Sequence, residues 1–165
     1  MRIINRIRMK YFNLAVPAVY LFASIPASHA QQRPFGLGLM IGEPAGISAK
    51  MWTSDTNAFD FGLGWSILNY RDGSKNGFHF HADYIIHSFK TIGSTGQFPL
   101  YYGIGGRFNS SVGRVSSFAV RGVIGIAWIP AKPPIDIFLE AAPSLELTPA
   151  PGFVLEAAVG LRYFF

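Results

Sequence analysis

The chain contains no cysteine, which excludes a disulfide framework, a thiolate metal site and a cysteine nucleophile. Charged residues make up only 14% of its 165 residues. After residue 30, no apolar run approaches the roughly 20 residues that a membrane-spanning helix needs. A Gly-x-Ser-x-Gly nucleophile elbow is also missing, and no catalytic dyad stands out. We therefore expect neither enzyme activity nor a cofactor.

The first thirty residues combine a basic start, an apolar stretch and an ending of small residues. Residues 1–10 hold four cations and no acid, residues 11–26 are mostly apolar, and Ser28-His29-Ala30 places small residues on both sides of a variable one. This order is typical of a secretory signal peptide and predicts cleavage before Gln31. The alternative is a retained anchor, for which the apolar stretch is too short.

Removing residues 1–30 changes what the net charge indicates. The whole chain has 14 Lys and Arg against 9 Asp and Glu; without the four cations of the leader, 10 face 9 and the net charge is +1. The basic isoelectric point therefore belongs mostly to the leader, and we expect no nucleic-acid partner. Residues 31–165 are suited to a single domain.

Eight segments of this domain alternate between apolar and mixed residues. Period-two alternation predicts strands, and the frequent glycines would weaken a helix. Each segment has one apolar face and one face that carries charge. Eight is the smallest even number for a transmembrane barrel, and lipid does not tolerate open strand edges. The sequence thus predicts an all-β, eight-stranded antiparallel up-and-down transmembrane β-barrel with strands at 35–41, 47–53, 58–68, 78–87, 100–108, 118–128, 135–145 and 153–165.

The last segment ends on the final residue of the given sequence, Phe165. Reading back from it in steps of two gives an unbroken apolar row to Phe153, whereas the other parity carries Glu156 and Arg162. An apolar face that ends in aromatic residues is the pattern expected of a strand in lipid. We therefore interpret this segment as the strand that closes the barrel.

The mixed faces carry four cations and five anions that nearly cancel. An eight-stranded barrel is only wide enough for side chains to fill it, and buried charges must pair. We predict a packed ion-pair network in the lumen, with a narrow small-solute or ion channel as the alternative. Alternation alone does not identify the inner face, so a soluble periplasmic barrel that binds a lipophilic ligand is a further alternative. The network residues are Lys50, Asp60, Asp83, Arg107, Arg121, Asp136, Glu140, Glu156 and Arg162.

One strand carries a cluster of candidate metal ligands on its mixed face. His79, His81 and Asp83 alternate, and His87 follows on the same side. Imidazole and carboxylate groups bind zinc or copper. Alternate residues lie roughly 7 Å apart along a strand, which suits two ligands better than three. We favour the interpretation that they are hydrogen-bond partners in the lumen and expect no metal.

The whole of residues 31–165 resembles the small OmpA/OmpX-type outer-membrane barrels. It more closely resembles an uncharacterised BAPKO-type family of bacterial barrels. This resemblance implies an outer-membrane barrel in a Gram-negative-type envelope and a final Phe165 that the assembly machinery reads; it implies no agreed activity. The motifs that carry it are Gly42-Glu43-Pro44-x-Gly46-Ile47-Ser48-x-Lys50, His79-x-His81-x-Asp83-Tyr84, Pro99-Leu100-Tyr101-Tyr102-Gly103-Ile104-Gly105, and Asp136-Ile137-Phe138-Leu139-Glu140 with Pro143.

Placing both termini in the periplasm predicts which loops face outward. The outer loops are 42–46, 69–77, 109–117 and 146–152, and the inner ones are 54–57, 88–99 and 129–134. Short outer loops favour a structural monomer whose partners are outer-membrane lipid and the assembly machinery. A surface-interaction role with anionic surface sugars or a host-cell ligand would involve Tyr70, Arg71, Lys75 and Arg114.

Overall fold

The computed structural model describes residues 33–65, 77–89, 97–111 and 115–165. The predicted signal peptide and its cleavage site lie outside these ranges. So do the four loop residues named above as contacts for surface sugars. Within the described ranges, no helix is long and apolar enough to cross a membrane.

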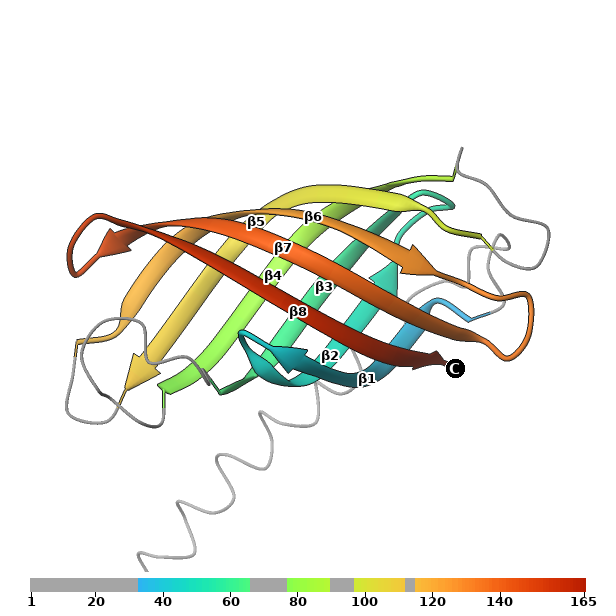
Figure 1. The fold of residues 1–165 in the computed structure, drawn as a ribbon, viewed down its shortest axis with the longest axis horizontal. Coiled ribbons are helices and arrows are strands. Elements are labelled where there is room, and N and C mark those ends of the chain that lie inside the picture. Colours follow the sequence, from blue (N-terminus) through green and yellow to red (C-terminus); the bar gives the residue numbers. More distant parts are fainter. Residues whose placement is uncertain (1–32, 66–76, 90–96, 112–114) are drawn as a thin grey trace, which may run out of the picture. The chain divides into compact units, whose positions relative to one another are not determined.

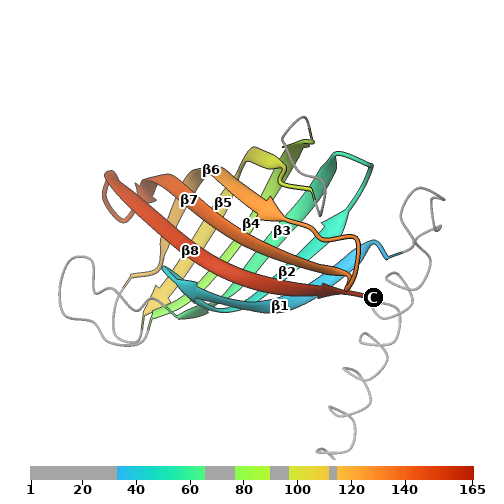
Figure 2. The same cartoon turned by 45° about the vertical axis from the view of Figure 1, so that its right-hand side comes forward.

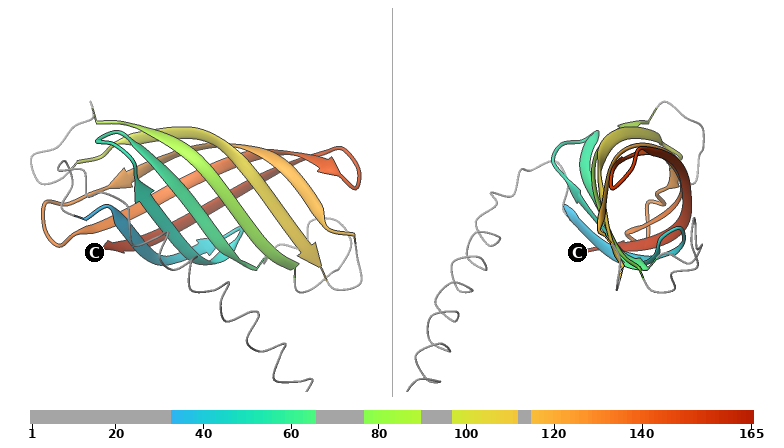
Figure 3. Two further views of the ribbon diagram at one scale, coloured as in Figure 1. Left: turned by 180° about the vertical axis from the view of Figure 1, so that it is seen from behind. Right: turned by 90° about the vertical axis from the view of Figure 1, so that its left-hand side faces the viewer.

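The eight strands form one closed antiparallel barrel, in which β8 returns to pair with β1 (Figure 3). The predicted fold class, an eight-stranded up-and-down barrel, is confirmed. The strands are β1 (Phe35–Gly42), β2 (Ala45–Trp52), β3 (Asn57–Trp65), β4 (Gly77–Ser88), β5 (Leu100–Ser111), β6 (Ser117–Trp128), β7 (Ile135–Thr148) and β8 (Gly152–Phe164).

Three of the predicted outer loops are shorter in the structure. The loop predicted at 109–117 lies between β5, which continues to Ser111, and β6, which begins at Ser117. The loop predicted at 42–46 is a turn of Glu43 and Pro44, and the loop predicted at 146–152 is reduced to 149–151 because β7 continues to Thr148. The ladder between β7 and β8 extends to Glu146 opposite Gly152. Small and polar residues near a turn predict a loop, but backbone pairing in a hairpin continues until the turn itself interrupts it.

The side chains alternate between an exposed apolar exterior and a buried interior that carries charge. Leu39, Ile41 and Phe153 point outward and are 67%, 70% and 71% exposed. Charged side chains of the opposite parity are almost completely buried. The predicted division into an apolar face and a charged face is therefore confirmed, and the charged face is the lumen.

Large inward side chains pack against inward glycines of neighbouring strands. A Cβ on Gly160 would lie 2.4 Å from the Phe138 ring, and one on Gly125 would lie 2.3 Å from the ring of Tyr101. Any larger residue at either site would displace the ring. These glycines give the large interior side chains the room that they occupy.

The register fixes how steeply the strands run. Gly38 of β1 pairs with Arg162 of β8 on one side. In the other direction, the chain of paired residues that starts at Gly38 crosses β2 to β7 and reaches β8 at Gly152, ten residues from Arg162. The paired residues along this path are Ser48, Gly62, His81, Arg107, Ala119 and Glu146. A shift of ten residues over eight strands corresponds to a tilt of roughly 40°.

The barrel wall has two heights. We call β1 and β2, with 8 residues each, the short wall; β3 has 9 residues up to Trp65, where the described range ends. The long wall is β4 to β8, with 12 to 14 residues. In Figures 1 and 2 the turn between β1 and β2 lies well short of the turn between β7 and β8, whereas the strands reach a similar level at the end that carries the C-terminus.

Candidate functional site

The charged interior gathers all nine residues of the predicted network. Each is at most 6% exposed, and Lys50 and Asp136 are not exposed at all. Their contacts fall into two groups along the barrel. We call the group nearer the C-terminus the lower tier and the group nearer the β7–β8 turn the upper tier.

The lower tier is organised around Arg162 of β8. Its guanidinium donates to both carboxylate oxygens of Asp60, at 2.7 and 2.8 Å, to the hydroxyl of Ser48 at 2.8 Å and to Asp136 at 3.3 Å. Lys50 Nζ lies 2.6 Å from Asp136 Oδ2. Two cations and two carboxylates from four strands thus neutralise one another, as buried charges must.

Aromatic rings form a floor beneath the lower tier. Lys50 Nζ lies 5.4 Å from the ring centre of Trp52 and 5.3 Å from that of Tyr101, so the ammonium sits among aromatic rings. The Arg162 guanidinium lies over the Phe138 ring, with its central carbon 3.8 Å from the ring centre. These rings join Phe164 in one buried apolar cluster, which fills the barrel at the end where the C-terminus lies.

The upper tier is organised around two arginines. Arg107 lies 2.6 Å from both Glu146 and Glu156. Arg121 approaches three carboxylates at 3.3 to 3.6 Å, those of Asp83, Glu140 and Glu156. Its Nε and Nη1 atoms make no hydrogen bond within the described residues, so the upper tier is held less tightly than the lower one.

The histidines do not form the metal site that the sequence allowed. His79 Nε2 and His81 Nδ1 lie 2.9 Å apart in the upper tier. His87 lies in the lower tier, with Nε2 3.3 Å from Lys50 Nζ and Nδ1 3.1 Å from the carbonyl of Thr56. Asp83 faces Arg121 instead. Among the described residues, no three His, Cys, Asp or Glu side chains are grouped to hold a metal ion.

The interior contains two acids that the sequence analysis left out. Glu43, in the β1–β2 turn, is 6% exposed, and the Glu146 side chain is 17% exposed. Glu146 has the inward parity of β7 and was missed because the predicted strand ended at 145. Glu43 lies in the predicted outer loop 42–46, and only the folded barrel shows that its side chain is buried. The described interior therefore carries more anions than cations.

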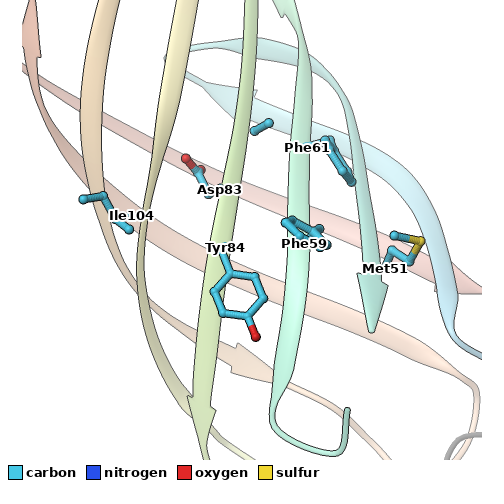
Figure 4. Close-up of a pocket in the computed structure, with 7 residues that line it drawn as sticks. Met51, Phe59, Phe61, Asp83, Tyr84 and Ile104 are labelled. Carbon is cyan, nitrogen blue, oxygen red and sulfur yellow. The ribbon is translucent and has the colours of Figure 1, made fainter. Parts of the chain in front are cut away.

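A shallow hollow of about 440 Å³ lies on the outer face, and Asp83 of the network is among the residues that line it (Figure 4). Ala82 of β4 pairs with Phe61 on one side and with Gly106 on the other. The small residues leave a depression among larger outward neighbours. The outward residues that line it are Met51, Phe59, Phe61, Ala82, Tyr84 and Ile104. This surface is mostly apolar, and the Asp83 carboxylate is engaged with Arg121 at 3.3 Å.

No family model, curated protein or solved structure matches the chain. Paired and buried side chains at the centre of a narrow barrel are suited to holding its wall together.

Proposed function

We propose that the chain is an integral outer-membrane β-barrel with a filled polar lumen and a structural or surface-interaction role. The observation that carries this proposal is the inverted distribution of polarity. Arg107, Arg121 and Arg162 are 1–2% exposed inside the barrel, whereas large apolar side chains such as Ile104, at 64%, are exposed outside. Lipid is the solvent in which such an exterior is stable.

Aromatic residues near both ends of the long wall support this proposal. Trp128 and Tyr163 lie at the end near the C-terminus, and Phe78, Phe118 and Phe153 lie at the opposite end. All five are between 36% and 71% exposed. Girdles of aromatic side chains at both membrane interfaces are typical of outer-membrane barrels.

The soluble alternative requires the opposite arrangement. A periplasmic barrel that binds a lipophilic ligand needs an apolar lumen and a polar exterior. Here the described lumen is crossed by ion pairs such as Arg162 with Asp60. The channel alternative requires free space, but the interior charges contact one another at 2.6 to 3.6 Å.

The remaining parts of the proposal follow the resemblance to OmpA/OmpX-type and BAPKO-type barrels. Export by the signal peptide would deliver the chain to the assembly machinery, which would read Phe165. Outer-membrane lipid is the partner for the outward face. A monomer without metal or nucleic acid fits the interior described above, and surface sugars or a host-cell ligand would be met at the outer loops.

Fractionation and gel migration test the membrane location. We expect the protein in the envelope fraction, extracted by detergent but not by alkaline carbonate, and migrating differently on gels before and after boiling. Recovery in the soluble periplasmic fraction would contradict the proposal. In planar bilayers we expect conductance at baseline; discrete channel openings would favour the channel alternative instead.

A further inference from the structure

The seam between β8 and β1 leaves part of β8 without a partner strand. The ladder stops at Gly42 opposite Ala158, and the Glu43 amide makes one further bond to the Ala157 carbonyl. On its other edge β8 stays paired with β7 up to Gly152. Five residues of β8, Gly152 to Glu156, therefore rise above the β1–β2 turn with one edge unpaired among the described residues.

The pairing pattern identifies the residues whose backbone amides and carbonyls face this unpaired edge. Backbone groups of alternate residues in a strand point to the same edge. Because the Ala157 carbonyl points toward β1, the amides and carbonyls of Leu155 and Phe153 point the same way. Their side chains are 55% and 71% exposed on the outer face. We call the gap above the β1–β2 turn, beside residues 152–156 of β8, the notch. It is bounded by apolar side chains and by polar backbone groups.

Strand tilt does not account for the notch. At a tilt of roughly 40°, neighbouring strands that end level are offset by only about one residue. At the opposite end of the seam, Gly36 pairs with Phe164, so β1 and β8 end together there. Five residues amount to roughly 12 Å along the barrel axis. The top of the short wall is therefore lower than the long wall by that amount.

The short wall is also too short for a full bilayer. A transmembrane strand needs roughly 9–11 residues, and β1 and β2 have 8 each. If hydrocarbon reached the top of the long wall all round, it would cover the unpaired edge, where each unsatisfied backbone group costs several kcal/mol. The unpaired backbone groups therefore require water or lipid headgroups at the notch.

We propose that the barrel thins the bilayer on one side. Along the short wall, hydrated lipid headgroups of the leaflet that contains the β1–β2 turn descend to the level of Glu43 and Pro44. Along the long wall the same leaflet keeps its full depth. This inference rests on the proposed membrane location, and with the predicted topology the thinned leaflet is the outer one. The partner of this surface is the hydrated headgroup layer.

Depth-dependent quenching tests the proposal, and a chain without cysteine accepts single labels without background. Ile41 and Leu139 both lie opposite Val159, on its two sides, and so probe the short wall and the long wall; strand tilt places Ile41 about two residues nearer the level of the β7–β8 turn than Leu139. Ile41→Cys, Leu139→Cys and Phe153→Cys would each carry a fluorophore in phosphatidylcholine vesicles. Lipids with a nitroxide at the headgroup or deep in the chain would serve as quenchers.

We expect deep quenching at Leu139 and headgroup-level quenching at both Ile41 and Phe153. Deep quenching at Ile41, equal to that at Leu139, would overturn the proposal. Lack of quenching at Phe153 would also overturn it, because the long wall would then project into water from a flat membrane. Absence of quenching at all three sites would instead refute the membrane location itself.

The label sites are chosen so that the variants fold. All three side chains are outward and 57–71% exposed, and heat-modifiable migration identifies the folded fraction before each measurement. Ile47→Cys, which lies opposite Leu39, repeats the measurement on β2. Agreement between Ile41 and Ile47 on headgroup-level quenching supports thinning along the wall, and deep quenching at Ile47 would overturn it.

Discussion

Replacing Arg162 by Met tests the interior network at its best-connected point. The guanidinium is 1% exposed, makes four hydrogen bonds to three side chains and stacks on Phe138. Arg162→Met leaves Asp60 buried without its bidentate partner, while Asp136 keeps Lys50. Breaking one partner of a buried ion pair typically costs about 3–5 kcal/mol.

The double variant Asp60→Leu/Arg162→Met is the control for this prediction. It removes both charges, and exchange of a buried pair for apolar residues is often neutral or stabilising. We therefore expect it to recover most of the stability that Arg162→Met loses. Arg162→Lys, which keeps the charge but not the planar fork, should fall between the wild type and Arg162→Met.

Guanidinium unfolding in vesicles, followed by tryptophan fluorescence, is the assay. With a slope of roughly 4 kcal/mol per molar guanidinium, a loss of 3–5 kcal/mol lowers the midpoint by about 1 M. The reasoning would be refuted if the single variant unfolded at the wild-type midpoint. It would also be refuted if the double variant were less stable than Arg162→Met, because the pair would then not be the source of the cost.

Three further predictions concern other parts of the barrel. Gly160→Ala should lower the free energy of unfolding by about 1–3 kcal/mol, because the added methyl group overpacks against Phe138. Gly122→Ala is the control and should unfold at the wild-type midpoint, because its Cβ would meet no atom nearer than 3.9 Å. Equal midpoints for the two variants would contradict the packing argument. Leu139→Arg should destabilise the vesicle-embedded protein by about 2–4 kcal/mol but leave a detergent-folded sample less affected, and equal losses would argue against lipid contact. Phe165→Ala should fold in vitro with nearly wild-type stability, since this ring is 64% exposed, yet reach the envelope in reduced amount; unchanged amounts on immunoblots of envelope fractions would count against its role as an assembly signal.

Much of the wall was predictable because strand alternation is a local property. Arg107, Arg121 and Arg162 each lie on the charged face of their own strand. The sequence alone therefore predicts that they point to the same side of the sheet as the other charged residues. Turn boundaries were less predictable. The predicted network does not include Glu146, because β7 stays paired beyond its last clearly alternating residue. How far a strand stays paired depends on its partner strand.

The contacts within the network were not predictable. Arg162 meets Asp60 and Ser48 at sequence separations of 102 and 114 residues, and only closure of β8 on β1 brings them together. The separation of the histidines into two tiers has the same origin. His79 and His87 share one face of β4, but the strand carries them to different levels and different partners.

Eight amphipathic strands and the face on which each side chain lies follow from the sequence alone, because each depends on neighbours within a few residues. The charge balance of the interior does not, because Glu43 and Glu146 join it only in the folded barrel. The tertiary structure decided which face is the lumen, which charges pair and that the wall is lower at β1 and β2. These depend on register and closure between strands, where a shift of ten residues around the barrel sets what every interior side chain meets.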